Sequence, residues 1–172
     1  MAWTTPITWV AARLYASQLN QQIRDNMNFL YAPYACEAYH NTTKSIANNT
    51  WTPLDLNTDR RDTNAMHDPS YSSGQYIAIP LAGWWYVGAW AEFAANAVGN
   101  RGIRLLVDGA TVICQDLRPN VGAASGIQIH LDRLWYWSGT SGSIRADVFQ
   151  DSGGALNVSA GAEMYAIWLG NS

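Results

Sequence analysis

Residues 83–93 read GWWYVGAWAEF, and this stretch decides the fold class. Successive side chains of a β-strand point to opposite faces, so every second residue shares a face. One face is wholly apolar and predicts a core strand; it consists of Trp85, Val87, Ala89, Ala91 and Phe93. The other face is more aromatic than a solvated strand face, so we predict that it contacts another subunit. Its members are Trp84, Tyr86, Gly88, Trp90 and Glu92.

Short alternating segments surround this strand. Residues 103–107 (IRLLV) lead into Asp108-Gly109, a strong hairpin signal, and residues 111–117 (TVICQDL) follow. We interpret DSGG, residues 151–154, as a second hairpin turn. Eight to ten short strands with no helix among them predict a mainly β fold, an antiparallel jelly-roll sandwich. The remaining strand candidates lie at 127–131, 144–148 and 163–169, with one short edge strand inside 57–71.

The N-terminal part has a different pattern. Residues 17–31 read SQLNQQIRDNMNFLY, in which Leu19, Ile23, Met27 and Leu30 form one apolar stripe of a helix. We expect Ser17 to cap this helix and Pro33 to stop it. A helix of about four turns is marginal alone, so the stripe needs a partner surface. Before it lies an extended apolar arm that contains Trp3, Ile7 and Trp9.

These patterns predict two parts of the chain. Residues 1–35 form the arm and one short α-helix, and residues 36–172 form the jelly-roll. The 172 residues carry 10 basic and 13 acidic side chains, a balance that argues against a nucleic-acid-binding protein. No apolar run approaches the roughly 20 residues that cross a membrane, and the N-terminus does not resemble a signal peptide. Cys36 and Cys114 form either one disulfide or two buried thiols.

The sequence offers little for catalysis. Asp151-Ser152-Gly153-Gly154 is similar to a protease nucleophile loop, but Gln150 precedes it and the chain is short for two barrels. Glu92 and Glu163 are strand acids, and nothing in the sequence shows that they converge as glycoside hydrolysis requires. We therefore predict a non-enzymatic protein without metal or cofactor.

Nine Trp and nine Tyr leave one alternative open. Trp135 and Trp137, or the aromatic residues of 84–90, have side chains that can stack on sugar rings. That reading makes the protein a receptor-binding module for host-surface glycans. We favour subunit contacts, because small residues flank the strand aromatics in GWWYVGAW.

Residues 77–104, IAIPLAGWWYVGAWAEFAANAVGNRGIR, resemble the globular heads of the complement C1q and tumour necrosis factor superfamily. The matching pattern is an apolar strand, Pro80, a small residue, Gly83, and aromatic residues alternating along the next strand. The resemblance covers about residues 36–170. It implies a jelly-roll that assembles as a homotrimer, with Trp84, Tyr86 and Trp90 near the threefold axis.

Residues 4–30, TTPITWVAARLYASQLNQQIRDNMNFL, resemble the opening of tailed-bacteriophage structural proteins. The matching residues are Trp9, Ser17, Leu19, Asn20, Ile23, Arg24, Asp25, Asn26 and Leu30. This resemblance implies a virion protein, assembled in the bacterial cytoplasm, that serves as a fibre, spike or decoration knob. Trp3, Ile7 and Trp9 are then the virion anchor that contacts other capsid or tail proteins, and the helical stripe holds three copies together.

Overall fold

The computed structural model describes residues 15–70, 76–120 and 125–171. The predicted anchor residues Trp3, Ile7 and Trp9 lie outside these ranges. The chain divides after Tyr34 into two units, residues 1–34 and 35–172. Within the described ranges, no helix combines the length and apolar character that crossing a membrane requires.

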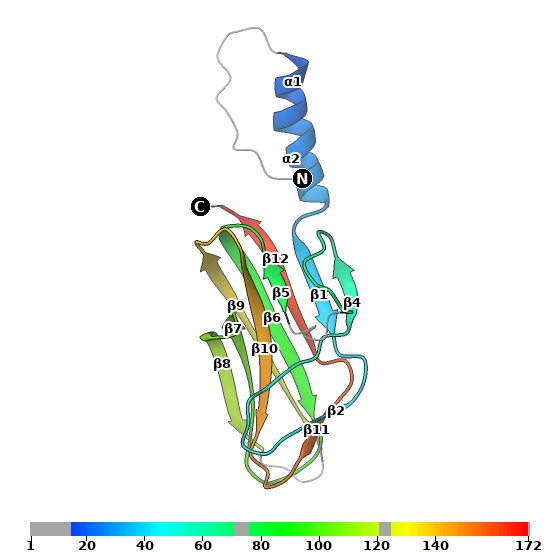
Figure 1. Ribbon diagram of the computed structural model, residues 1–172, viewed down its shortest axis with the longest axis vertical. Coiled ribbons are helices and arrows are strands. Elements are labelled where there is room, and N and C mark those ends of the chain that lie inside the picture. Colours follow the sequence, from blue (N-terminus) through cyan, green and yellow to red (C-terminus); the bar gives the residue numbers. More distant parts are fainter. Residues whose placement is uncertain (1–14, 71–75, 121–124, 172) are drawn as a thin grey trace. The chain divides into compact units, whose positions relative to one another are not determined.

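The described part of the first unit is helical from Ala16 to Tyr31 (Figure 1). It consists of α1 (Ala16–Leu19), a π-helical segment η1 (Asn20–Asp25) and α2 (Asn26–Tyr31). The prediction that Ser17 is the cap is wrong. Tyr15 is the N-cap residue, and the side chain of Gln18 accepts its backbone N–H at 3.1 Å, so Ser17 already lies in the first turn. The Gln18 side chain therefore satisfies the N–H of the cap residue itself, which is the role of the third helical residue in a capping box.

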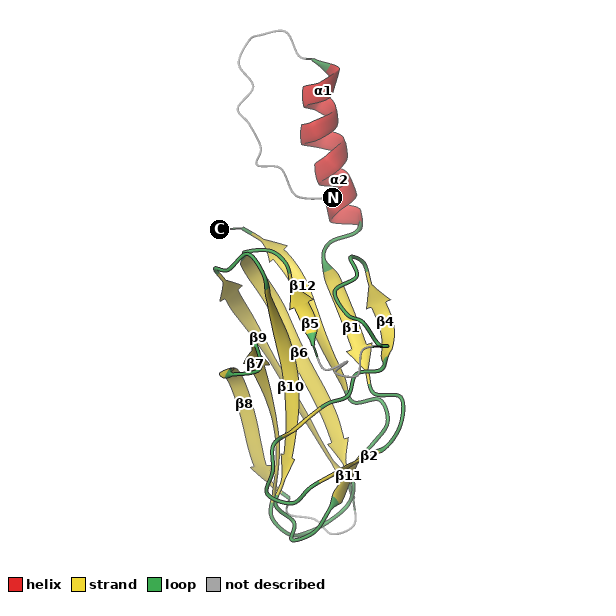
Figure 2. Ribbon diagram, viewed as in Figure 1, coloured by secondary structure: helices red, strands yellow, loops and turns green. Residues whose placement is uncertain are grey.

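The second unit is built from two antiparallel sheets that face each other (Figure 2). The seven-stranded sheet contains β1 (Ala35–Tyr39), β2 (Lys44–Ile46), β4 (Thr58–Asp62), β6 (Gly83–Phe93), β9 (Ile127–Trp137), β11 (Leu156–Val158) and β12 (Glu163–Gly170). The five-stranded sheet contains β3 (Thr52–Pro53), β5 (Ile77–Ile79), β7 (Asn100–Val107), β8 (Thr111–Pro119) and β10 (Gly142–Gln150).

The mainly β, two-sheet architecture agrees with the sequence prediction. The described residues contain twelve strands, more than the eight to ten expected. The excess comes from short strands of two or three residues, β2, β3, β5 and β11, which are too short to show an alternating pattern. The predicted edge strand is β4, the last strand of its sheet beside β1.

Strand β6 is central to the seven-stranded sheet. It pairs along its whole length with β9, from Gly83 opposite Trp137 to Phe93 opposite Ile127, and on its other side with β12. Its apolar face lies in the core as predicted, and those five side chains are fully buried. The indole N–H of Trp85 donates to the carbonyl of Leu81 at 3.0 Å, so the largest core side chain is also satisfied as a donor.

The predicted hairpin at Asp108-Gly109 is confirmed. It joins β7 to β8, and both residues have positive φ, 49° and 67°. The N–H of Ala110 donates to the carbonyl of Val107 at 3.1 Å. These are the features of a type I′ turn, which favours Asp or Asn followed by Gly.

The interpretation of DSGG as a hairpin turn is wrong. Residues 151–154 connect β10 in one sheet to β11 in the other. Asp151 fixes the place where the chain leaves β10. Its carboxylate accepts hydrogen bonds from the backbone N–H of Asn100 and, at 2.9 Å, from the side-chain amide of the same residue. The segment therefore closes one end of the sandwich instead of joining neighbouring strands.

The Asp151 contact makes stability depend on pH. The hydrogen bonds from Asn100 hold the pKa of Asp151 below its usual value. Their stabilisation is present above the unfolded pKa of about 3.9 and is lost as pH falls through the lower folded pKa. Asp151→Asn should therefore lower the free energy of unfolding by about 1–2 kcal/mol at pH 7, and the difference should vanish towards pH 2. Urea unfolding across pH measures this. Asp116→Asn, in an ion pair with exposed Arg118, is the control, and an equal loss in both variants would contradict the assignment.

Candidate functional site

The outer surface of the seven-stranded sheet gathers large apolar and aromatic side chains from three adjacent strands. The register places Tyr136 of β9 opposite Trp84, and places Leu134 of β9 and Ile167 of β12 on either side of Tyr86. We call this surface the aromatic face. It comprises Trp84, Tyr86, Trp90, Leu134, Tyr136, Tyr165, Ile167 and Leu169.

The end of the aromatic face that begins at Gly83 is an exposed apolar patch. Its five members are Trp84, Leu134, Tyr136, Ile167 and Leu169, and each exposes between 36% and 58% of its surface. The rings of Trp84 and Tyr136 lie edge to face with centroids 5.3 Å apart. Clustered exposed apolar side chains are typical of surfaces that bind another molecule.

The middle of the aromatic face is held by Tyr165. Its ring lies directly over Gly88, since a Cβ at Gly88 would approach the Tyr165 hydroxyl to 2.2 Å. The ring also lies 5.7 Å from that of Tyr86, and the hydroxyl lies 3.3 Å from Nε2 of His130. Burial, followed by the hydrogen bond with Tyr86, raises the pKa of Tyr165 well above its usual value. Tyr165 is therefore neutral at physiological pH.

The other end of the aromatic face is charged. Arg60 of β4 contacts Glu163 at 2.7 Å and Glu37 at 3.0 Å, and its guanidinium lies 4.8 Å from the ring centre of Tyr39. Burial raises the pKa of Glu163, although Trp90 and Arg60 act in the opposite direction. The surface therefore changes along β6 from an apolar to a charged end, which gives it a direction.

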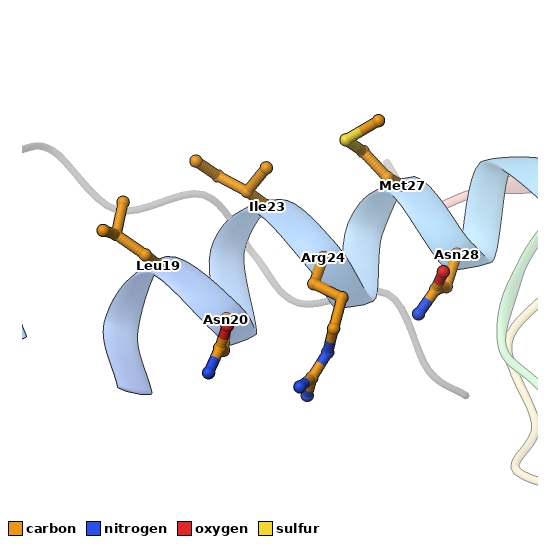
Figure 3. Close-up of a pocket in the computed structure, with 6 residues that line it drawn as sticks. All are labelled: Leu19, Asn20, Ile23, Arg24, Met27 and Asn28. Atoms are coloured by element: carbon orange, nitrogen blue, oxygen red, sulfur yellow. The ribbon is translucent and has the colours of Figure 1, made fainter. Parts of the chain in front are cut away.

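The helical stripe is the second exposed apolar surface. Leu19, Ile23 and Met27 lie in one row along the helix, beside a polar row of Asn20, Arg24 and Asn28 (Figure 3). Together with Leu30, the apolar side chains expose between 39% and 69% of their surface. An α-helix has 3.6 residues per turn, so side chains four residues apart rotate gradually around the helix axis. The wider turn of η1 holds more residues and reduces this rotation. The predicted stripe is thus present, and the π-helical turn is a feature that the spacing did not reveal.

The predicted glycan contacts lie on the opposite side of their strand from the aromatic face. Trp135 pairs with buried Trp85, and Trp137 pairs with Gly83. Both side chains are half-buried and stack on each other at 5.4 Å. The ring of Trp137 also packs against Gly139 and Gly142. This packing explains their position structurally, and a glycan role for them stays a prediction.

Two of the residues considered for catalysis, Ser152 and Glu163, have structural partners. The hydroxyl of Ser152 donates to the side-chain carbonyl of Gln150 at 2.6 Å, and Glu163 is paired with Arg60. Cys36 and Cys114 are both free thiols and form no disulfide; Cys36 is buried as predicted, whereas Cys114 is only half-buried. Burial raises the pKa of both thiols, which keeps them protonated. Within residues 15–70, 76–120 and 125–171, no three His, Cys, Asp or Glu side chains gather as a metal site would require.

Comparisons with solved structures identify the jelly-roll. Eiger TNF from S. frugiperda superposes with a TM-score of 0.59 at 10% identity, covering 80% of this chain and 93% of that chain. The globular domain of zebrafish complement 1qA gives 0.58 at 12% identity, with 80% and 98% covered. Murine APRIL gives 0.57 at 11% identity, with 78% and 98% covered. No protein-family model and no curated protein matches the chain.

These likenesses show that the second unit has the TNF and C1q type of jelly-roll fold. They confirm the fold class and that part of the sequence resemblance. Of the site, the sequence revealed Trp84, Tyr86 and Trp90, which the structure places on one face. It did not reveal Leu134, Tyr136 and Ile167, because their place depends on pairing between strands distant in sequence. The alternation of side chains along β9 and β12 was the only sequence pattern that could have indicated that they share an outer face.

The contact between Gly88 and Tyr165 can be tested by a double-mutant cycle. Gly88→Ala should lower the free energy of unfolding by about 1–3 kcal/mol, because the new methyl group displaces the Tyr165 ring. Adding Tyr165→Ala should recover part of that loss, since the clashing atoms are then gone. Gly154→Ala, where a Cβ meets no atom within 4 Å, is the matched control. Purely additive losses at positions 88 and 165 would contradict the arrangement.

Proposed function

We propose that this chain is a non-enzymatic structural protein of a tailed-bacteriophage virion. Its jelly-roll assembles as a homotrimeric head through the aromatic face. Its N-terminal arm and helix, residues 1–35, attach that head to the particle. The head then serves as a fibre, spike or decoration knob on the capsid or tail.

The exposed apolar patch on β6, β9 and β12 is the observation that carries the assembly. Burying a fully exposed large apolar side chain contributes about 1.5–3 kcal/mol, and five such side chains here are roughly half exposed. Burying them between copies would therefore offset a substantial part of the translational and rotational entropy lost on association. The number of copies follows from the resemblance to C1q and TNF heads, which implies a threefold axis.

The helical stripe supports the same assembly. Leu19, Ile23, Met27 and Leu30 are exposed in the single chain. Three parallel copies would bury them against one another and supply the partner surface that a short helix needs. The π-helical turn keeps the first three in one row, so they can meet along a common seam.

The virion role rests on the resemblance of residues 4–30 to the opening of tailed-phage structural proteins. In such a protein the helix lies between an anchor and a projecting head. Trp3, Ile7 and Trp9 supply the apolar side chains that would dock on a capsid or tail neighbour. No catalytic step is required of the head in this role.

Native mass by gel filtration with light scattering tests the assembly. We expect about 57 kDa for three copies of 19.0 kDa. Ile167→Asp should shift the mass to 19 kDa at micromolar concentration, because a charge would be buried in the aromatic face. Val112→Asp, on exposed β8 of the other sheet, should leave the trimer intact.

A monomeric wild-type chain, or a trimer that survives Ile167→Asp, would overturn this assignment of the interface. In the first case the aromatic face stays exposed, and a ligand-binding platform becomes the better explanation. That outcome would revive the glycan-binding alternative for Trp84, Tyr86 and Trp90. Circular dichroism confirms that each variant is folded before its mass is compared.

The anchor is tested separately from the trimer. The double variant Trp3→Ala with Trp9→Ala should keep the mass of the trimer but fail to enter phage particles. Immunoblots of particles purified from an infected host that expresses the tagged variant measure this. Wild-type protein absent from purified particles would refute the virion role, and normal incorporation of the variant would refute only the anchor.

A further inference from the structure

The outer surface of the five-stranded sheet holds a buried carboxylate between two arginines. Asp147 of β10 exposes only 1% of its surface although it faces away from the core. Arg104 of β7 lies directly across the ladder from it, and Arg145 lies two residues before it on the same face of β10. One negative charge is therefore shared by two positive charges.

Both guanidinium groups bind this carboxylate with two nitrogens. Arg104 donates from Nε and Nη2 to Oδ2 of Asp147, at 3.1 and 2.8 Å. Arg145 lies 2.8 Å from Oδ1 through Nε and 3.2 Å from Oδ2 through Nη2. Arg145 also donates to the carbonyl of Gly109 at 3.4 Å and hydrogen-bonds Tyr76. Oδ2 of Asp147 thus accepts hydrogen bonds from both arginines, whereas Oδ1 has only the ionic contact with Nε of Arg145.

Aromatic packing fixes Arg104 in one orientation. Its guanidinium lies 4.4 Å from the ring centre of Trp51, which itself packs against Phe149 at 5.1 Å. Trp51 can lie flat on the sheet because Gly102 has no side chain; a Cβ there would meet the indole at 3.0 Å. A stacked, ion-paired guanidinium loses little further freedom when it binds a ligand.

The cluster keeps one uncompensated positive charge, whereas the whole chain carries −3. Asp108, in the turn after β7, accepts the backbone N–H of Ser143 at 2.8 Å and forms no ion pair with either arginine among the described residues. Among the described residues, Nη1 of Arg104 has no acceptor, and the Arg104 side chain is still 21% exposed. Removing the two guanidinium groups from water is costly, and Asp147 compensates only one of their two positive charges. A bound anion would compensate the second.

We propose that this cluster is a binding site for an oxyanion, the carboxylate or sulfate group of an acidic ligand. Arg104 supplies its remaining guanidinium donors, Arg145 adds charge, and Asp147 holds both arginines in place. The half-buried rings of Trp51 and Phe149 flank the site, so an anionic group carried on a sugar ring would gain stacking that a free anion lacks. The site lies within a single chain and does not depend on the virion role.

Titration followed by NMR tests the site. Sodium sulfate is added at constant ionic strength against chloride, and the Nε–H signal of Arg104 and the indole N–H signal of Trp51 are followed. We expect both signals to shift with a saturable curve in the millimolar range. Arg104→Gln should weaken binding at least tenfold, and Arg118→Gln should leave it unchanged. Arg118 is the matched control because it is an ion-paired arginine on the same sheet and its loss changes the net charge equally.

Further variants keep the proposal decidable. Arg104→Lys preserves the charge and Asp147 pairing, and it should still weaken sulfate binding several-fold because the planar fork is lost. A sulfated disaccharide that binds more tightly than sulfate, while its desulfated form does not bind, would assign the anion to a saccharide. Equal affinity for sulfate and the disaccharide would assign a free anion. Linear shifts without saturation, or unchanged binding in Arg104→Lys, would overturn the proposal.

Discussion

The backbone ladder that joins β6 to β9 and β12 is the constraint on which the rest of the structure depends. It fixes which side of each strand faces the other sheet. On β6 it sends Trp85, Val87 and Phe93 into the core, where they are fully buried. A shift of one residue in this register would exchange the two faces and expose the largest core side chain. Core and outer surface are therefore consequences of one pairing.

The same ladder assembles the aromatic face from segments far apart in the sequence. Tyr136 and Ile167 join Trp84 and Tyr86 only because β9 and β12 lie on either side of β6. Gly88 then leaves the space that the Tyr165 ring fills. The apolar patch, the central tyrosine and the charged group around Arg60 follow one another along the strands. An assembly formed through this surface would have a fixed direction along β6.

Local patterns in the sequence predicted what depends on local physics. Alternation predicted β6 and its core face, Asp108-Gly109 predicted a turn with positive φ, and the 4, 4, 3 spacing predicted the helical stripe. Features that depend on distant residues were missed or wrong. The DSGG segment crosses between sheets, and Asp151 at its start binds Asn100 of β7, 51 residues away. The cluster of Arg104, Asp147 and Trp51 likewise requires β7, β10 and the residue before β3, and no spacing in the sequence joins them.

The outer surfaces of the two sheets differ in the contacts that their large side chains make. On the five-stranded sheet, Trp51 packs on Arg104 and two arginines pair with Asp147, while Val112 and Leu117 of β8 remain exposed. Burying that surface against another copy would desolvate a net positive cluster at considerable cost. On the seven-stranded sheet, the apolar patch is exposed and gains free energy when it is buried. The physical expectation is that copies associate through the aromatic face, while the arginine cluster stays turned outward and open to an anionic ligand.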